Sequence, residues 1–255
     1  MSRRRMGRLV SVALAGLVCL TIVGTGFASA RAAAHHEIHQ SQVTTSAAVQ
    51  PLPAPAAAPS PSQPSIPAPA PGPVVVSIGD SIMEGHGLAP DRAWLALLAS
   101  EKGWQLTNLA SDGSGFVAVG SNGDTFADQA AAAELLHPDV VVFSGSSNDL
   151  GVSDSRVDAA TAATIAALHA ALPETMIVSI SAIWGDSDVP EKFSTIDSAV
   201  ETATAAAGGI YLDAGQPLSE DSALMQADQI HPTADGQLLL ARAVQQAMLS
   251  HGVTF

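Results

Sequence analysis

Short runs of β-branched apolar residues alternate with alanine-rich stretches of helical length from residue 74 to the C-terminus of this 255-residue chain. This alternation is typical of parallel strands that are covered by helices. We therefore expect an α/β fold, a three-layer α/β/α sandwich with a central, mostly five-stranded parallel sheet. The predicted strands are 74–78, 105–109, 139–144, 175–180 and 209–212, and the predicted helices are 91–102, 125–136, 155–171, 190–207 and 233–249.

Residues 1–30 have the pattern of an export signal. Four arginines, the last of them Arg8, precede an apolar run that ends at about Phe27, and Ala28-Ser29-Ala30 supplies the small residues of a signal-peptidase site. The alternative is an uncleaved membrane anchor, because the apolar run is close to the length that a bilayer requires. The chain's one cysteine, Cys19, lies in this segment, so we expect no disulfide or thiol chemistry after cleavage.

Residues 31–73 are dominated by alanine, proline, serine and glutamine, and this composition predicts an extended linker without a core. A histidine cluster at 35–39 contains metal-binding residue types but lacks the His-Glu-x-x-His spacing, so we expect no metal site there. The signal and the linker together predict a secreted or cell-wall-associated protein. If the signal is not cleaved, the domain would be membrane-anchored and external.

The folded part, residues 74–255, is strongly acidic. The whole chain has a formal net charge of −14, and all of its 24 acidic residues except Glu37 lie in this part, with only five of its ten basic residues. Such a surface repels nucleic acid and anionic lipid. We therefore expect no nucleic-acid partner, and a membrane contact only through an uncleaved N-terminal segment.

Functional residues of a parallel α/β sheet lie in the loops that leave the carboxyl ends of the strands. Loop 181–189 lies at this edge, and its Trp184 fits a pocket wall and a packing role equally well. Trp94 and Trp104, in or beside the first long predicted helix, are expected in the core. Four further loops at this edge are polar or glycine-rich: 79–87, 110–116, 145–151 and 213–231.

Two of these loops contain the side chains of a serine hydrolase. Ser81 follows the first strand, where a nucleophile can stand exposed, and Asp228 and His231 lie together in the last loop. A serine hydroxyl needs a base to take its proton, and a histidine base works best when a carboxylate fixes its tautomer. We therefore expect Ser81 as the nucleophile, His231 as the base and Asp228 as the residue that orients it.

Two competing motifs fail on their context. Residues 113–118 formally fit the dinucleotide-binding fingerprint, but the glycines at 120 and 123 interrupt the helix that should start there. The Gly-x-Ser-x-Gly elbow of α/β-hydrolases is absent, because Met83 stands where its second glycine would be. A nucleotide enzyme and an α/β-hydrolase are both disfavoured.

Four short blocks of sequence, in their order along the chain, resemble the motifs of the SGNH family, also called GDSL hydrolases, of the secreted bacterial, actinobacterial type. The resemblance covers residues 74–255 and implies the flavodoxin-like SGNH hydrolase fold. It also implies that Ser81, Gly113 and Asn148 form the oxyanion hole and that Asp228 and His231 supply acid and base. We expect no cofactor and no metal. The blocks are Gly79-Asp80-Ser81, Asn108-Leu109-Ala110-Ser111-Asp112-Gly113, Ser147-Asn148-Asp149 and Asp228-x-x-His231.

One block departs from the family pattern. The family usually has a glycine two residues before the asparagine, where this chain has Ser146, with Gly145 one position earlier. The departure predicts a different bend in this loop. Asp80 and Asp149 are also typical of the family, and we expect both to stabilise turns through local backbone hydrogen bonds.

The sequence thus predicts an exported, monomeric serine esterase that acts through an acyl-enzyme. Because few aromatics and no long apolar insertion are present to form a lid, we expect short acyl esters, such as acetyl on a carbohydrate or another small molecule. Two alternatives stay open at this point. The domain could be an inactive wall-associated binding module, or it could transfer the acyl group to an acceptor other than water, since both reactions share the acyl-enzyme.

Overall fold

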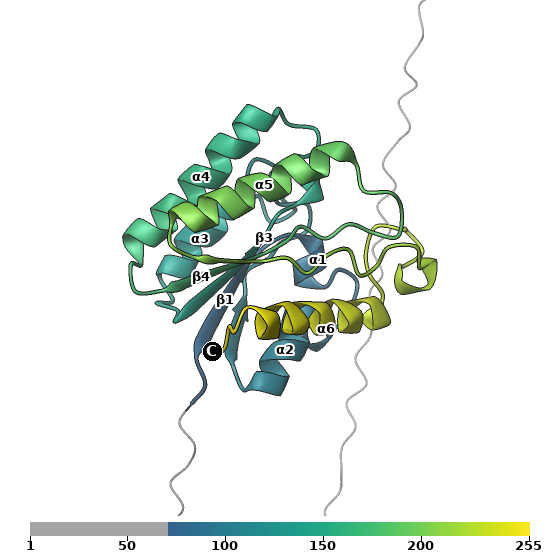
Figure 1. Cartoon of the computed structure of the whole chain (residues 1–255), viewed down its shortest axis with the longest axis horizontal. Helices are drawn as coiled ribbons and strands as arrows, with labels where there is room; N and C mark the ends of the chain where they lie inside the picture. Colours follow the sequence, from purple (N-terminus) through teal and green to yellow (C-terminus); the bar gives the residue numbers. More distant parts are fainter. Residues whose placement is uncertain (1–70) are drawn as a thin grey trace, which may run out of the picture. The chain divides into compact units, whose positions relative to one another are not determined.

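The computed structural model describes residues 71–255, which form a twisted sheet between two layers of helices (Figure 1). The expected signal, almost all of the expected linker and the histidine cluster at 35–39 lie outside the described residues and stay predictions. Within the described part of the chain, no helix is both long enough and apolar enough to cross a membrane.

The sheet contains five strands, all parallel, in the order β2-β1-β3-β4-β5. Val76 of β1 lies opposite Thr107 of β2 and Val141 of β3, and β3, at the centre, is buried along its whole length. The chain reverses its direction of travel across the sheet between β1 and β3, where the loops diverge and ligands usually bind. The strands are β1 (Val74–Ile78), β2 (Gln105–Asn108), β3 (Val140–Ser144), β4 (Met176–Ile180) and β5 (Ile210–Leu212).

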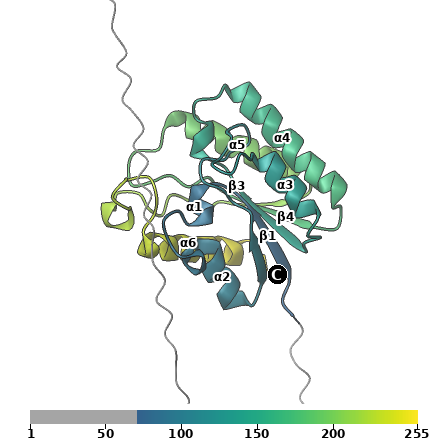
Figure 2. The ribbon, with the colours of Figure 1, turned by 180° about the vertical axis from the view of Figure 1, so that it is seen from behind.

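The long helices divide between the two faces of the sheet. Figure 1 and the opposite view in Figure 2 show α2 and α6 together on one face, and α3, α4 and α5 on the other. The predicted α/β/α sandwich is therefore confirmed. The helices are α2 (Trp94–Lys102), α3 (Phe126–Glu134), α4 (Asp154–Ala171), α5 (Glu191–Ala206) and α6 (Ala234–Ser250).

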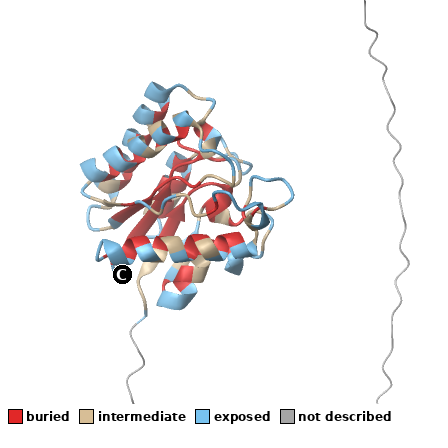
Figure 3. Cartoon of the chain, turned by 45° about the vertical axis from the view of Figure 1, so that its right-hand side comes forward, coloured by how far each residue is buried: buried red, intermediate tan, exposed pale blue. Residues whose placement is uncertain are grey.

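Alternate residues of the strands build two separate cores. Val75 and Val142 point to the layer of α2 and α6, where they join Leu240, whereas Val76 and Phe143 point to the other layer. This follows from the period of two in a strand, which sends neighbouring side chains to opposite faces. Figure 3 shows the result as a buried sheet between helices that are buried only on their inner sides.

The sequence predicted each strand and long helix to within about three residues at either end, but the predicted helix 91–102 is divided. A 3₁₀ turn occupies Pro90–Arg92, and α2 begins only at Trp94 because Ala93 has an extended backbone, with φ −62° and ψ 142°. Three further short elements were not predicted, since three or four residues are too few to show a helical period. They are α1 (Ser81–Glu84) and the 3₁₀ turns Ser147–Asp149 and Ser222–Leu224.

Trp94 and Trp104 are core residues, as predicted from the sequence. Both are buried against the layer of α2 and α6. The Trp104 indole N–H donates to the carbonyl of Phe255 at 2.7 Å, and the two rings stack with centroids 4.6 Å apart. The last residue of the chain is thereby fixed to the start of β2.

A buried glutamine joins α6 to the segment that follows β1. Gln237 has no exposed surface, its Oε1 accepts from Trp94 N at 2.8 Å, and its Nε2 donates to Ile82 O at 3.0 Å. We predict that Gln237→Leu lowers the free energy of unfolding by roughly 2–4 kcal/mol, because two buried backbone groups lose their partner.

Urea denaturation measures this loss, and Gln246→Leu is the matched control. Gln246 is exposed on the same helix, so its replacement should change the free energy of unfolding by less than about 0.5 kcal/mol. Equal effects of the two variants would contradict the assignment of a structural role to Gln237.

Candidate active site

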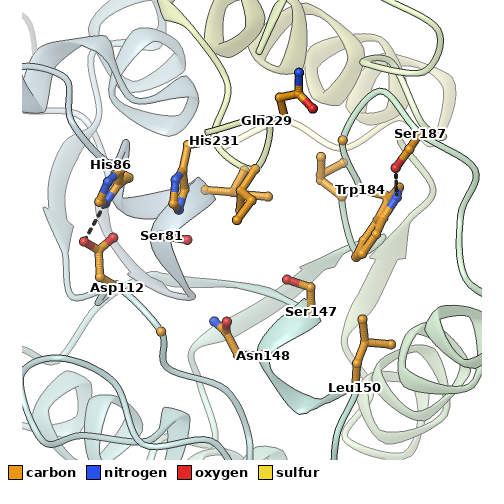
Figure 4. Close-up of a pocket in the computed structure, with 15 residues that line it drawn as sticks. Ser81, His86, Asp112, Ser147, Asn148, Leu150, Trp184, Ser187, Gln229 and His231 are labelled. Atoms are coloured by element: carbon orange, nitrogen blue, oxygen red, sulfur yellow. Dashed lines mark hydrogen bonds and ion pairs between the residues drawn. The ribbon is translucent and has the colours of Figure 1, made fainter. Parts of the chain in front are cut away.

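A pocket of about 430 Å³ opens at the carboxyl ends of the strands, where the sequence placed the functional loops (Figure 4). Its lining brings together residues that are far apart in the sequence. Asp228 does not line the pocket and reaches it through His231. The lining residues used below are Ser81, His86, Asp112, Gly113, Asn148, Leu150, Ile183, Trp184, Ile230 and His231.

Ser81 is presented by the tight turn that leaves β1. Asp80 is the N-cap of α1, and its Oδ1 accepts from Ile82 N at 3.0 Å, so Ser81 becomes the first helical residue. The helix ends after one turn at Gly85, whose φ of 84° is the left-handed conformation that glycine adopts readily. Ser81 is 8% exposed and faces the pocket.

The Asp80 carboxylate is buried, and burial raises its pKa, while hydrogen bonds from Ser146 and the backbone act in the opposite direction. The Ser146 hydroxyl donates to Asp80 Oδ2 at 2.8 Å and so connects the loop after β3 to the nucleophile turn. Ser146 itself is extended, with φ −130° and ψ 135°, a conformation open to any residue. Asn148 lines the pocket, and the bend of this loop relative to the family stays a prediction.

The imidazole of His231 is held by Asp228. His231 Nδ1 lies 2.8 Å from Asp228 Oδ2, and Asp228 Oδ1 accepts from the backbone N–H groups of Ile230 and His231. These hydrogen bonds lower the pKa of Asp228 well below its ordinary value, so the carboxylate is ionised at neutral pH. An ionised partner at Nδ1 keeps the proton there and leaves Nε2 free to accept one.

The Ser81 side chain and the His231 ring both line the pocket, and Figure 4 shows them in the same part of it. No direct hydrogen bond joins them among the contacts of the described residues. Nucleophile and base commonly stand further apart in a free enzyme and come closer in the substrate complex. Their placement suits a transfer of the serine proton to the imidazole.

Two further groups can donate hydrogen bonds to an anionic oxygen near Ser81. One N–H of the Asn148 amide donates to Ser114 O at 2.9 Å, which orients the side chain and leaves its second N–H available. Gly113 lies in the pocket wall with a φ of 77°, which a residue with a side chain adopts only under strain. Neutral donors of this kind are suited to a developing oxyanion.

Asp149 stabilises more than the local turn that the sequence predicted. Its fully buried carboxylate accepts backbone N–H groups from Phe116, Val117 and Ala118, at 2.7, 3.1 and 2.8 Å. These donors are more than 30 positions away, so the prediction of a local bond was wrong for Asp149, whereas it is confirmed for Asp80. A Cβ on Gly115 would lie 2.6 Å from Asp149 Oδ2, so only glycine fits there.

Gln129 of α3 is a supporting residue that the sequence analysis missed. Its Oε1 accepts from Gly79 N at 3.0 Å, and its Nε2 lies within 3.2 Å of Gly79 O and 3.0 Å of Ser114 Oγ. The available signal was its spacing, since it lies on the same helical face as the buried residues Phe126 and Ala133. Gln129 thereby fixes the glycine that precedes the nucleophile turn.

His86 and Asp112 were also missed, although both lie in loops that the sequence assigned to the site. His86 Nδ1 is 2.6 Å from Asp112 Oδ2, and the His86 ring stacks on the His231 ring with centroids 3.9 Å apart and planes 23° apart. Potential ligand atoms of His86, Asp228 and His231 lie within 4.8 Å of one another. Since His231 and two backbone N–H groups already occupy the Asp228 oxygens, this group serves the Asp228–His231 pair and is no ready metal site.

Trp184 satisfies both interpretations that the sequence left open. It lines the pocket, and its ring packs edge-on against Phe193 of α5, with centroids 5.2 Å apart. Its indole N–H donates to Ser187 Oγ at 3.1 Å. Trp184 and Leu150 lie on the far side of Ser81 from Asp112 (Figure 4), and with Ile183 they supply the apolar part of the pocket lining.

The role of Asp149 gives a prediction for the site. Asp149→Asn should lower kcat at least about tenfold and the free energy of unfolding by roughly 1–3 kcal/mol, because its amide N–H₂ cannot accept the hydrogen bonds that the carboxylate accepts. Ester hydrolysis and urea denaturation measure the two effects. Asp158→Asn, on the exposed side of α4, is the control and should change neither.

Comparison with known proteins shows the family to which the chain belongs. The model of the GDSL-like lipase/acylhydrolase family matches residues 77–239. The GDSL lipase Rv0518 of Mycobacterium tuberculosis (strain ATCC 25618 / H37Rv) is 29% identical over 180 residues, which cover 66% of this chain and 78% of that protein.

Solved structures share the fold at low sequence identity. The crystal structure of TesA has a TM-score of 0.56 and 19% identity, covering 70% of this chain and 97% of TesA. A carbohydrate esterase family 2 enzyme with a carbohydrate-binding domain, from Corynascus thermopiles, has a TM-score of 0.57 and 16% identity, covering 74% of this chain and 69% of that one. Because the family model spans most of the described sheet and its loops, this chain belongs to the GDSL-like lipase/acylhydrolase family.

Proposed function

We propose that the protein is a serine esterase in which Ser81 is the nucleophile, His231 the general base and Asp228 the residue that orients His231. The observation that carries this proposal is the juxtaposition of Ser81 with a histidine whose Nδ1 is held by a carboxylate, inside one pocket. The same three residue types perform acyl transfer on several unrelated folds, and they are recognised by geometry and role.

In the proposed reaction, Ser81 Oγ attacks the ester carbonyl while His231 Nε2 takes the hydroxyl proton. The negative charge that develops on the carbonyl oxygen is stabilised by the Asn148 amide and the backbone N–H groups of Ser81 and Gly113. Collapse of this intermediate breaks the ester bond, and His231 gives its proton to the departing alcohol. Water then attacks the acyl-enzyme, again through His231, and releases the carboxylic acid with Ser81 restored.

The substrate that we propose is a short acyl ester, such as an acetyl group on a carbohydrate. A volume of about 430 Å³ lies in the lower part of the range of ligand pockets, and the wall of Leu150, Ile183 and Trp184 suits an apolar group of limited length. One solved structure of similar fold is a carbohydrate esterase, which supports a sugar ester as the first class to screen.

We also propose that the protein is exported and acts outside the cytoplasm as a monomer. The support is the arginine-rich start, the apolar run and the small residues at 28–30. N-terminal sequencing of material from the culture medium tests the export. A mature chain that begins near residue 31 is expected, whereas membrane-bound material that retains residues 1–30 would indicate an anchor.

The substrate proposal predicts the order of rates on p-nitrophenyl esters. We expect kcat/KM to be highest for acetate or butyrate and to fall steadily toward palmitate, because a long chain outgrows the pocket. Ser81→Ala should abolish turnover with an unchanged circular dichroism spectrum. A clear preference for palmitate would overturn the short-chain proposal, and full activity of Ser81→Ala would overturn the mechanism.

The oxyanion-hole proposal predicts a loss in kcat for Asn148→Ala. We expect kcat to fall by roughly two to three orders of magnitude with KM little changed, as for other single oxyanion donors. Steady-state kinetics on p-nitrophenyl acetate measure both constants. Asn122→Ala, in the loop after β2 and outside the pocket lining, is the control and should keep wild-type kinetics. Full activity of Asn148→Ala would remove Asn148 from the site.

A further inference from the structure

We infer that His86 is a positioning residue that sets the place of the His231 ring relative to Ser81. The inference rests on the proposed function, since it concerns how the same pocket is assembled. His86 contacts both the nucleophile turn and the base loop, which come from opposite ends of the described chain. Neither the serine nor the histidine block of the family contains this residue.

The backbone joins His86 rigidly to the nucleophile. The N–H groups of Gly85 and His86 both donate to Ser81 O, each at 3.0 Å, and close the turn in which Ser81 stands. His86 therefore keeps a fixed relation to the nucleophile.

The side chain of His86 is also held in place. Its Nδ1 is 2.6 Å from Asp112 Oδ2, and Asp112 is anchored in turn because its carbonyl accepts from Ser121 N at 2.7 Å. Glu84 lies close to Asp112, and burial together with this neighbour raises the pKa of Glu84.

The loop that contains His231 depends on contacts with this turn. Residues 227–230 of this loop are exposed, with Ile230 at 60%, whereas Met225 and Pro232 at its base are buried and pair with each other. Gln226 provides the connection, since its N donates to His231 O at 2.7 Å and its Nε2 lies 2.8 Å from His86 O. The two loops are thus joined through the backbone of His86 as well as through its ring.

The ring contact adds a constraint that Asp228 does not provide. The hydrogen bond at Nδ1 fixes one corner of the His231 imidazole but permits the plane to tilt about it. The His86 ring lies flat against this plane at 3.9 Å and 23°, which limits the tilt. Because an error of about 1 Å in a catalytic group can cost roughly a hundredfold in rate, such a limit affects the chemical step directly.

The test compares His86→Phe with His86→Leu in the full-length protein. Phenylalanine keeps a flat ring against His231, whereas leucine fills a similar volume without one. We expect His86→Leu to lower kcat on p-nitrophenyl acetate by about 10- to 100-fold with KM changed less than about twofold. The kcat of His86→Phe should be at least about tenfold higher than that of His86→Leu. His169→Ala, on α4 and outside the pocket, is the control and should keep wild-type kinetics.

A second readout separates positioning from substrate binding. The rate at which a fluorophosphonate probe labels Ser81 should fall in parallel with kcat. The melting temperature of the variant should stay well above the assay temperature, so that unfolding does not explain the lower rate. Equal kcat for the leucine and phenylalanine variants would overturn the inference, as would a rise in KM with kcat unchanged. Labelling that survives in His231→Ala and disappears only when His86 is also replaced would make His86 a base and overturn it too.

The outcomes for His86 and for the proposed function are distinguishable. If the wild-type protein hydrolyses p-nitrophenyl acetate and Ser81→Ala does not, the serine esterase stands whatever the His86 variants show. If the wild-type protein is inactive and unlabelled, the proposed function fails and the role of His86 fails with it.

Discussion

A buried hydrogen bond from the Ser146 hydroxyl to the Asp80 carboxylate connects the ends of β1 and β3, and the site is arranged around it. Asp80 uses its other oxygen to cap the turn that presents Ser81, and Ser146 Oγ also accepts from Asn148 N at 3.1 Å. One carboxylate and one hydroxyl thus position Ser81 and Asn148, the proposed nucleophile and oxyanion donor, together. A buried polar pair is stabilising only when its members are satisfied, which is the case here.

A second layer of buried polar groups holds this arrangement to the rest of the fold. Gln129 of α3 binds the backbone at the start of the turn that contains Ser81. Asp149 accepts hydrogen bonds from the backbone of 116–118, and Gln237 of α6 donates one to the backbone of the Ser81 turn. The apolar cores on both faces of the sheet leave these groups little freedom. The loops at the strand ends are therefore held by hydrogen bonds to buried side chains as well as by apolar packing.

Much of this could be predicted from the sequence, for identifiable reasons. The strands were predictable because β-branched runs such as 74–76 and 140–142 stand out between alanine-rich helices. The sequence also placed Ser81, Gly113, Asn148 and His231 in loops at one sheet edge, and the structure brings them to one pocket. Their catalytic roles stay predictions until they are measured.

What the sequence did not show depends on tertiary contacts. The hydrogen bonds of Asp149 span more than 30 positions, and the stacking of His86 on His231 spans 145, so no local pattern encodes them. The turn α1 was missed because four residues carry no helical period. Trp184 was undecided between pocket and core because one ring performs both functions.

Membership of the family and a shared fold do not by themselves establish an activity, because one fold hosts many functions. The central claim is that Ser81 is an activated nucleophile, and the most direct measurement is mass spectrometry of the purified protein after reaction with a fluorophosphonate probe. We predict one adduct, on the peptide that contains Ser81, and none on the Ser81→Ala variant. A folded wild-type protein that carries no adduct, or carries it on another residue, would contradict the account.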